Sequence, residues 1–463
     1  MVERCGDTPA APRRREPVST TLHRIACKAR NEPSFKFTSL FHLMNEELLR
    51  GCFARLRGDA AAGIDGRTKA EYAENLEANL VGLVNRLHRM AYRPQAVRRV
   101  YIPKPGSEKG RPLGIPALED KMVQSGMTRI LEQIYEQEFI EDSYGFRARR
   151  GCHDALRALS VTVESGRMEW IVEADIKGFF DNVDHDWLML FMGRRIGDKR
   201  MLRMVKRFLK AGVMEEGKMY ASEEGVPQGG SISPILSNIY LHYALDLWFE
   251  KGFRRVCGGA ARLIRYADDF VACFATRADA ERFDRDLSTR LAKFGLEVEP
   301  TKTKVLAFGP DAARRARREG KRKPDTFDFL GFTHYCSRTR NGRRFRMKRV
   351  TARKKLRVKL ADIKEWLKEN RAKMTTRELW QKVREKLRGH YGYYGVTDNS
   401  IGIGRFYMEV KKLLYKWLNR RSQRKAMNWD KFNMMDKRIP LPRPRIRVNL
   451  FAQPKTPVQI DLL

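Results

Sequence analysis

The feature that most constrains this chain is an acidic turn, Tyr266-Ala267-Asp268-Asp269, set between two short apolar runs at 263–264 and 270–274. Apolar runs on both sides of a tight turn predict a β-hairpin with its two carboxylates at the tip. Adjacent carboxylates repel each other, and a fold tolerates them most readily beside a cation. A surface turn with no function is the alternative. Other acidic residues that could share a cation with this turn would favour a metal site over a surface turn without function.

Asp175 is the first such partner, because it ends a short buried strand expected at 170–176. Later segments predict a helix from Asp184, a long helix over 232–250, the acidic hairpin, a helix near 278–294 and a strand at 303–308. This order is typical of a small antiparallel sheet with helices packed on one face, the ferredoxin-like plan.

In such a sheet the strands that carry Asp175 and Asp268 can be neighbours, although they lie far apart in sequence. Their carboxylates would then hold two Mg²⁺ ions about 3.5–4 Å apart, an arrangement that clamps the attacking and leaving oxygens of phosphoryl transfer. Hard divalent cations prefer oxygen ligands, which explains aspartates rather than His or Cys. For Asp175 taken alone, a strand-end cap remains the alternative.

The charge of the chain indicates a polyanionic partner. There are 93 Lys+Arg against 56 Asp+Glu, a formal net charge of +37. Such an excess repels itself in a compact protein and is typical of nucleic-acid binding. A protein that is merely basic and soluble is the alternative, but the charge is spread through folded segments rather than confined to one tail.

The cysteines and the apolar segments bear on location. The seven cysteines include no Cys-x-x-Cys pair, which favours a reducing compartment over a disulfide framework or a zinc ribbon. No apolar run is long enough for a transmembrane helix, so no membrane partner is expected. We expect a cytoplasmic or nucleoid-associated protein if the source is bacterial, with an organelle as the alternative. The oligomeric state is left open between monomer and dimer.

The segments 174–181, 226–231 and 266–269 resemble motifs A, B and C of reverse transcriptases, specifically those of the group II intron-encoded reverse transcriptase/maturase family. Other family blocks are matched in order, by residues 63–66, 102–116, 143–156, 329–332 (the primer-grip strand), 391–395 and 417–421. The chain departs from the family at Ala148-Arg149-Arg150, where Pro is common, and at Glu299, where Asn is usual. Both positions are peripheral to the acids.

The resemblance implies an α+β right-hand polymerase fold, with fingers and palm built on the ferredoxin-like sheet, followed by an α-helical thumb. The expected parts are a flexible basic arm over 1–35, a helical N-terminal extension over 36–95 with the turn Gly63–Gly66, fingers and palm over 96–335, a helical thumb/maturase (X) domain over 336–435 and a Pro-rich tail over 436–463. No zinc-bearing endonuclease domain is expected, because the last His is His390 and the last Cys is Cys336.

The resemblance also implies roles for residues. Asp175, Asp268 and Asp269, with the backbone of Ile176, would be the catalytic metal ligands for two Mg²⁺, with Mn²⁺ as a substitute. The expected nucleotide contacts are Lys104 and Arg111 on the triphosphate, Phe180 beneath the sugar, Gln228 and its glycines near the base pair, and Lys302 as proton donor to pyrophosphate. A core phenylalanine is the alternative for Phe180, and an exposed surface lysine for Lys302.

A separate basic stretch is expected to bind RNA through phosphate contacts, its members being Arg343, Arg344, Lys348, Arg349, Arg353, Lys354 and Lys355. A solvated helix face is the alternative. The run 314–318 lies in an expected polar loop over 310–324, and it either adds an RNA contact or is disordered.

Together these features predict an RNA-directed DNA polymerase that assists intron splicing and copies the intron into cDNA for retrohoming. Its partners would be structured intron RNA, an RNA template with a DNA primer, dNTPs and target DNA. Two rivals stay open: a splicing-only RNA-binding maturase, and a domesticated reverse transcriptase in defence or repair. A viral RNA polymerase is disfavoured by Phe180, since a bulky ring would exclude a 2′-hydroxyl.

Overall fold

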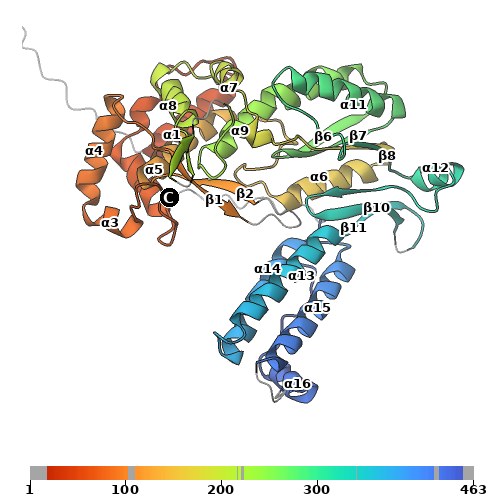
Figure 1. The fold of residues 1–463 in the computed structure, drawn as a ribbon. Coiled ribbons are helices and arrows are strands. Elements are labelled where there is room, and N and C mark those ends of the chain that lie inside the picture. The colour runs from red at the N-terminus through yellow and green to blue at the C-terminus, as the bar shows by residue number, and fades with distance from the viewer. Residues whose placement is uncertain are drawn as a thin grey trace, which may run out of the picture. The chain divides into compact units, whose positions relative to one another are not determined.

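The computed structural model describes residues 18–102, 110–215, 217–220, 224–339, 341–421 and 427–451 (Figure 1). The chain forms two compact units. Unit 1 comprises Met1–Tyr101, Pro112–Phe139 and Val183–Tyr240, and unit 2 comprises Ile102–Arg111, Ile140–Asn182 and Leu241–Leu463. In the described residues, no helix has both the length and the apolar character needed to cross a bilayer.

Unit 1 is mainly helical. Its helices are α1 (Val18–Asn31), η1 (Phe41–Leu43), α2 (Glu46–Arg55), α3 (Lys69–Glu74), α4 (Leu76–His88), α5 (Leu118–Tyr135), α7 (His185–Met192), α8 (Lys199–Leu209) and α9 (Ser233–Leu241). Within the helical extension expected over 36–95, η1, α2, α3 and α4 are present, and residues 63–66 lie outside any helix.

Helix α1 corrects the expectation of a flexible arm over 1–35. Residues Val18, Leu22 and Ala29 of this helix are buried, and the helix contacts α5. Its proline-free sequence places apolar residues on one face, which suffices for an amphipathic helix when a neighbouring helix covers that face. Residues 1–17 lie outside the described part of the chain.

The sheet of unit 1 has the strand order β2-β1-β4-β5, in which β1 (Val97–Ile102) and β2 (Arg111–Ile115) are neighbours. Strand β1 runs parallel to β4 (Val213–Glu215), and β4 pairs antiparallel with β5 (Lys218–Tyr220). Lys104, expected to contact the triphosphate, lies outside the described residues.

Unit 2 contains the four-stranded antiparallel sheet that the sequence predicts, in the order β6-β7-β3-β8. Its strands are β3 (Trp170–Ala174), β6 (Ala261–Tyr266), β7 (Asp269–Phe274) and β8 (Lys304–Ala307). Strand β3 is central, because it pairs with β7 on one side and with β8 on the other. The strand that ends before Asp175 therefore lies next to the acidic hairpin.

Helices cover both faces of this sheet, which corrects the expectation of one covered face (Figure 1). On one face, Phe274 of β7 contacts Phe283 of α11 (Arg277–Ala292), with ring centroids 5.3 Å apart. Side chains alternate along a strand, so Ile171 and Cys273 point to the other face. There they share a core with Leu156 of α6 (Cys152–Glu164).

The long helix expected over 232–250 is present but interrupted. It runs as α9, a π-helical segment η3 (His242–Asp246) and α10 (Leu247–Lys251), followed by the 3₁₀ turn η4 (Phe253–Val256). A π segment adds a residue to a helical turn and is frequent at functional sites. Helical periodicity in the sequence cannot reveal such a shift.

Two further expectations are corrected in unit 2. The loop expected over 310–324 contains α12 (Ala312–Arg318), held by buried Ala312 and Ala316 and by an Arg315–Glu169 ion pair of 2.7 Å. The expected primer-grip strand is a hairpin turn, because Leu330 and Gly331 have φ values of 49° and 79° between the closing pair Phe329 and Phe332.

That turn joins β9 (Thr326–Phe329) to β10 (Phe332–Arg338), and β11 (Phe345–Thr351) completes a three-stranded antiparallel sheet. Helices then follow, as expected of the C-terminal region: α13 (Arg353–Asn370), α14 (Thr376–Tyr394), α15 (Ser400–Asn419) and α16 (Trp429–Arg438). A capping box of Thr375 and Glu378 starts α14. The indole of Trp380 is buried against Phe432 and donates to the carbonyl oxygen of Ile439 at 2.7 Å.

Candidate active site

The acidic turn is a hairpin tip, as the sequence predicts. The last pair of strands β6 and β7 is Tyr266 with Asp269, which leaves Ala267 and Asp268 as a two-residue loop. Ala267 has a φ of 58°, in the left-handed region that residues other than Gly rarely adopt. The loop is therefore held in a conformation that Ala does not favour on its own.

The register of β3 and β7 brings the third acid to the same place. Their last pair is Ala174 with Phe270. Asp175 comes directly after Ala174, and Asp269 comes directly before Phe270, so the two acids are the next residues along the two neighbouring antiparallel strands. The expectation that Asp175 and the hairpin acids lie on neighbouring strands is confirmed by this register. Their roles as ligands and catalysts stay predictions.

The pKa values of the hairpin acids show that the carboxylates interact. Loss of hydration raises the pKa of Asp269 to about 6, and repulsion from Asp268 and Asp175 adds to the rise, although the residue remains exposed to solvent. Loss of hydration also raises the pKa of Asp268, and repulsion from Asp175 contributes. A cation at this site would relieve the repulsion that raises the pKa values of Asp268 and Asp269.

A protein cation already lies at this site. The ammonium of Lys302 forms an ion pair with Asp175 Oδ2, and this contact raises the pKa of Lys302. Among the residues that the structure describes, no three His, Cys, Asp or Glu side chains gather tightly enough to hold a metal ion. The acids are thus near enough to repel one another but do not form a closed ligand cluster. A metal at Asp175 would replace Lys302.

The backbone at Ile176 fits the expected ligand role. Ile176 bridges Val298, and the flanking bonds run from Glu299 N to the Asp175 carbonyl oxygen (2.8 Å) and from Lys177 N to the Glu297 carbonyl oxygen (2.9 Å). In an antiparallel pair whose flanking residues form the hydrogen bonds, the N–H and C=O groups of the central residue point away from the partner strand. The Ile176 carbonyl therefore faces the side of β7, where the acids lie.

Comparison with known proteins fits this geometry. Residues 102–334 match the family model described as "Reverse transcriptase (RNA-dependent DNA polymerase)". The chain belongs to the reverse transcriptase family. Members of this family use divalent metal ions, and the oxygen-only donor set of Asp175, Asp268, Asp269 and Ile176 fits such ions.

Similar proteins include a group II intron-encoded protein and an intron maturase. The chain is 38% identical to group II intron-encoded protein LtrA of Lactococcus lactis subsp. cremoris over 228 residues, 49% of this chain and 38% of LtrA. It is 34% identical to protein YkfC of Escherichia coli (strain K12) over 322 residues, 62% of this chain and 84% of YkfC. Nuclear intron maturase 3, mitochondrial, of Arabidopsis thaliana is 31% identical over 129 residues, 28% of this chain and 18% of that protein. The matched region thus spans well under half of LtrA.

Two more basic groups affect the acids of this reverse transcriptase family member. Burial raises the pKa of Asp268, and the guanidinium of Arg111, an expected triphosphate contact, offsets part of that rise. Burial raises the pKa of Asp269, and the ammonium of Lys355, expected at the RNA surface, offsets part of that rise.

Glu173 is an acid near the site that the sequence analysis missed. Burial raises the pKa of Glu173 to about 7, and Asp328 and Asp269 add repulsion. It lies on β3, paired with Lys304 of β8. The sequence does indicate Glu173, because it is an acid within an otherwise apolar strand. Its position two residues before Asp175 drew attention to Asp175 instead.

Phe180 lies in the 3₁₀ turn η2 (Phe179–Asp181), five residues after Asp175 and half-buried. Its ring meets that of Phe179 edge to face, with centroids 5.3 Å apart. Gly178, with a φ of 56°, starts the turn, and Asn182 Nδ2 donates to the Gly178 carbonyl oxygen at 3.1 Å. The turn thus fixes Phe180 after the strand, while sugar selection stays a prediction.

In unit 1, the loop of Gln228 needs its glycines for protein packing. The carbonyl oxygen of Gln228 accepts from Gly114 N at 2.6 Å. A Cβ at Gly229 would lie 2.3 Å from the Gly114 carbonyl oxygen, and one at Gly230 would lie 2.8 Å from Gln124 Oε1. The glycines thus let this loop pack closely against the backbone of β2 and the Gln124 side chain of α5. Contact with a base pair stays a prediction.

The expected RNA-binding residues divide by exposure. Arg343, Arg344, Arg353, Lys354 and Lys355 are exposed, and Lys348 is half-buried. Arg349 is fully buried and donates to Ser160 Oγ at 2.5 Å, so its expected RNA contact is wrong. The alternation of β11 turns Arg349 inward, opposite His334 of β10.

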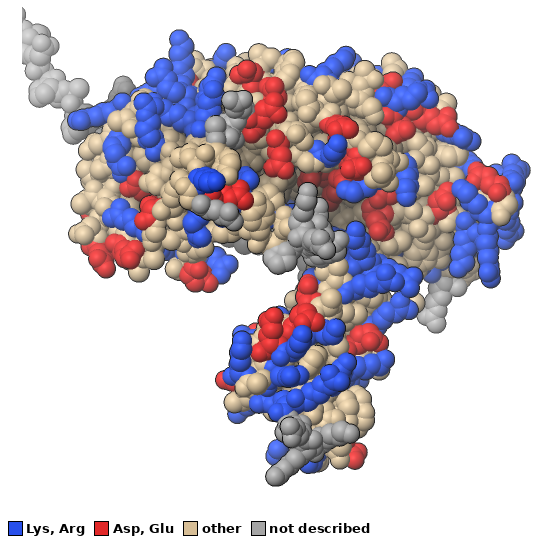
Figure 2. All heavy atoms as spheres, in the orientation of Figure 1, with Lys and Arg blue, Asp and Glu red and all other residues tan. Residues whose placement is uncertain are grey.

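Basic side chains also extend beyond the expected run. Figure 2 shows lysines and arginines spread over the helices α13, α14 and α15 and gathered at α12. The basic character of unit 2 is therefore a property of several helices.

Proposed function

We propose that this chain is the RNA-directed DNA polymerase of a group II intron, and that it also assists splicing of the intron RNA. The observation that carries the proposal is the strand register that puts Asp175 beside Asp269, next to Asp268 in the adjoining turn. The family and the names of the relatives support the same reading. In this proposal unit 2 supplies the palm and the thumb, while β1 and β2 belong to the fingers.

The acids hold two Mg²⁺ ions, with Mn²⁺ able to substitute, through Asp175, Asp268, Asp269 and the carbonyl of Ile176. When bound, such ions favour ionisation of a primer hydroxyl and neutralise charge on the triphosphate. The protein orients the reactants: Arg111 and Lys104 bind the phosphates of a dNTP, Phe180 fills the space of a 2′-hydroxyl, and the Gln228 loop lies along the base pair.

Lys302 has two roles in this proposal. It neutralises Asp175 through their ion pair while no metal is bound. When Lys302 is no longer paired with Asp175, its ammonium donates a proton to the leaving pyrophosphate. The exposed basic residues of α13 bind structured intron RNA, and the same chain acts on an RNA template with a DNA primer and on target DNA. In a bacterial source we place this work in the cytoplasm, at the nucleoid.

Asp268→Ala separates the polymerase reading from its rivals. We expect this variant to lose detectable cDNA synthesis on an RNA template while intron splicing in vitro persists, because the change removes a metal ligand and no basic surface. Asp286→Ala, an exposed acid on α11, is the matched control and should retain both activities.

Wild type that splices but makes no cDNA would contradict the polymerase reading and leave a splicing-only maturase. Wild type that makes cDNA but neither binds nor splices intron RNA would point to a domesticated reverse transcriptase instead.

A further inference from the structure

A buried arginine reaches the acidic turn from within the protein. Arg265 precedes the Tyr266–Asp269 turn in β6, and its side chain is fully buried. Its Nη1 donates to the carbonyl oxygen of Ala267 at 2.9 Å. The guanidinium thus holds the peptide group between Ala267 and Asp268 by a direct hydrogen bond.

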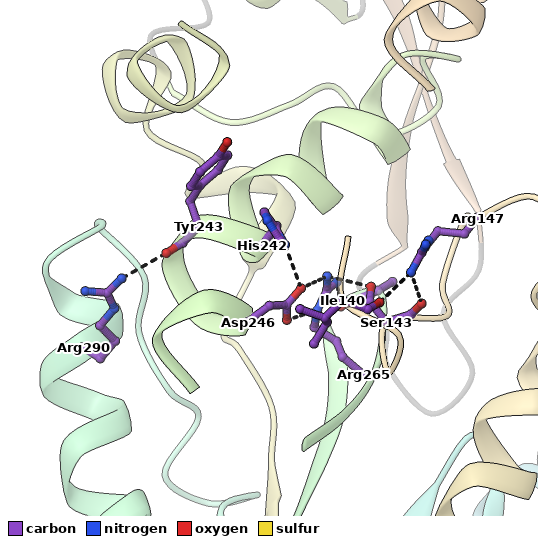
Figure 3. Close-up of polar contacts among 9 residues, drawn as sticks. Ile140, Ser143, Arg147, His242, Tyr243, Asp246, Arg265 and Arg290 are labelled. Atoms are coloured by element: carbon purple, nitrogen blue, oxygen red, sulfur yellow. Dashed lines mark hydrogen bonds and ion pairs between the residues drawn. The ribbon is translucent and has the colours of Figure 1, made fainter. Parts of the chain in front are cut away.

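The guanidinium is itself fixed by two partners. Its Nε and Nη2 donate to the carboxylate of Asp246, at 2.7 and 2.6 Å, and Nη2 also donates to Ser143 Oγ at 2.8 Å. Asp246 and Ser143 are likewise buried. Figure 3 shows the side chains of Arg265 and Asp246 pointing toward each other, with Ser143 beside them. A planar fork bound on several edges has little freedom to rotate.

Asp246 owes its position to the π segment. It is the last residue of the His242–Asp246 π segment, and Arg290 of α11 donates to the carbonyl oxygens of Tyr243 (3.0 Å) and Ala244 (2.8 Å) within it. The extra residue of a π turn rotates the residues that follow it relative to a regular helix. The irregular helix thus presents a carboxylate to Arg265.

The turn is also contacted by a neighbouring segment of unit 2. Ser143 forms a parallel bridge with Arg265, and Tyr144 N donates to the Arg265 carbonyl oxygen at 2.9 Å. A Cβ at Gly145 would lie 2.2 Å from Ala267 N and 2.9 Å from Ala267 Cα. Only glycine lets this segment run so close to the turn.

We propose that Arg265, fixed by Asp246 and Ser143, is a positioning residue that holds the Ala267-Asp268 turn in its left-handed conformation and thereby sets the location of Asp268. The inference rests on the proposed polymerase function and deepens it. Ala267 does not favour a φ of 58° by itself, so an external contact must maintain it. Buried ion pairs add little to stability but can specify one geometry.

The test compares two Arg→Lys variants on the same strand. Lysine at 265 keeps the charge but has a single nitrogen, which cannot bind Asp246, Ser143 and the Ala267 carbonyl together. Arg262→Lys is the matched control: Arg262 also makes a bidentate pair, with Asp142 at 2.7 and 2.8 Å, and bonds Thr162 rather than the turn. Steady-state primer extension on RNA gives kcat and the KM for dNTP, and hydrogen exchange follows the peptide covering 266–269.

Arg265→Lys should lower kcat about 10- to 100-fold, the effect expected of misplacing a catalytic group by about 1 Å, with little change in the KM for dNTP. It should also speed amide exchange over 266–269. Arg262→Lys should change neither. Arg265→Lys that matches Arg262→Lys in both readouts would overturn the inference. If wild type makes no DNA, the proposed function fails, and the exchange comparison alone decides this inference.

Gly145→Ala keeps the inference testable if Arg265→Lys does not fold, because it disturbs the turn from the other segment. It should lower kcat and speed exchange over 266–269 in the same way. Gly389→Ala, where an added Cβ meets nothing within 4 Å, should do neither. Unchanged kcat and exchange in Gly145→Ala would contradict the inference.

Discussion

At the scale of single residues, ionised carboxylates at the site lower the stability of the metal-free fold. The pKa of Asp269 is raised to about 6 by loss of hydration and by Asp268 and Asp175. A carboxylate with a raised pKa in the folded protein binds its proton more tightly there than in the unfolded chain. Ionisation of Asp269 therefore destabilises the metal-free fold, and stability falls as the pH rises from about 4, near the unfolded pKa, to above 6.

Asp269→Asn tests this cost. Without divalent metal, the variant should be more stable than wild type at pH 7.5, by ~1 kcal/mol at most, because Asp269 is exposed and solvent screens its repulsion. The advantage should shrink as the pH falls and vanish below about pH 4, where the carboxyl is protonated in both states. Urea unfolding in chelator from pH 4 to pH 8 measures it. An advantage that is the same at every pH would show that repulsion is not the cause.

At the scale of elements, regular patterns could be predicted from the sequence and irregular ones could not. The acidic hairpin, the strand before Asp175 and helices α11, α14 and α15 follow from apolar spacing and capping signals. Three features were missed or misjudged for different physical reasons. Helix α1 depends on a tertiary partner, the π segment leaves no periodic trace, and the Leu330-Gly331 turn interrupts a run that looks like one strand.

The candidate site divides in the same way. The acids are found by residue type and spacing, because metal chemistry needs carboxylates. The contacts that hold the turn cannot be found in this way. Arg265, Asp246 and Gly145 come from three separate segments, and only the fold brings them together. The RNA contact expected of Arg349 was wrong because Arg349 is buried. Alternation along a strand, not composition, decides which basic residues face solvent.

Helix α13 carries a prediction at this scale. The double variant Arg353→Ala/Lys354→Ala, at exposed positions in its first turn, should weaken intron RNA binding and reduce the slope of log K against log salt by about 1 for each RNA phosphate that the variant no longer binds. Lys355 is left in place because it affects Asp269. The control is Arg285→Ala/Lys293→Ala, an exposed basic pair of which one residue lies within α11 and the other just beyond its end. Equal slopes in the two double variants would exclude a specific role for the α13 surface.

At the scale of the whole molecule, the net charge and the three acids are opposite in sign. A net charge of +37 attracts a polyanion, while the three acids form a small negative centre within that basic protein. Divalent cations can occupy such a centre even though the surrounding field repels cations, because carboxylates bind them directly. The basic surface would then bind the nucleic acid, and the acids would act at its growing end.

Asp175 is the most direct test of this account, because only the sheet brings it to the hairpin acids. The measurement is the rate of primer extension with dNTPs on an RNA template, as a function of Mg²⁺, for wild type and Asp175→Asn. We predict Mg²⁺-dependent synthesis by wild type and a rate lower by a factor of about 10³ or more for the variant, with template–primer affinity unchanged. A variant that extends the primer within about tenfold of wild type would contradict the account.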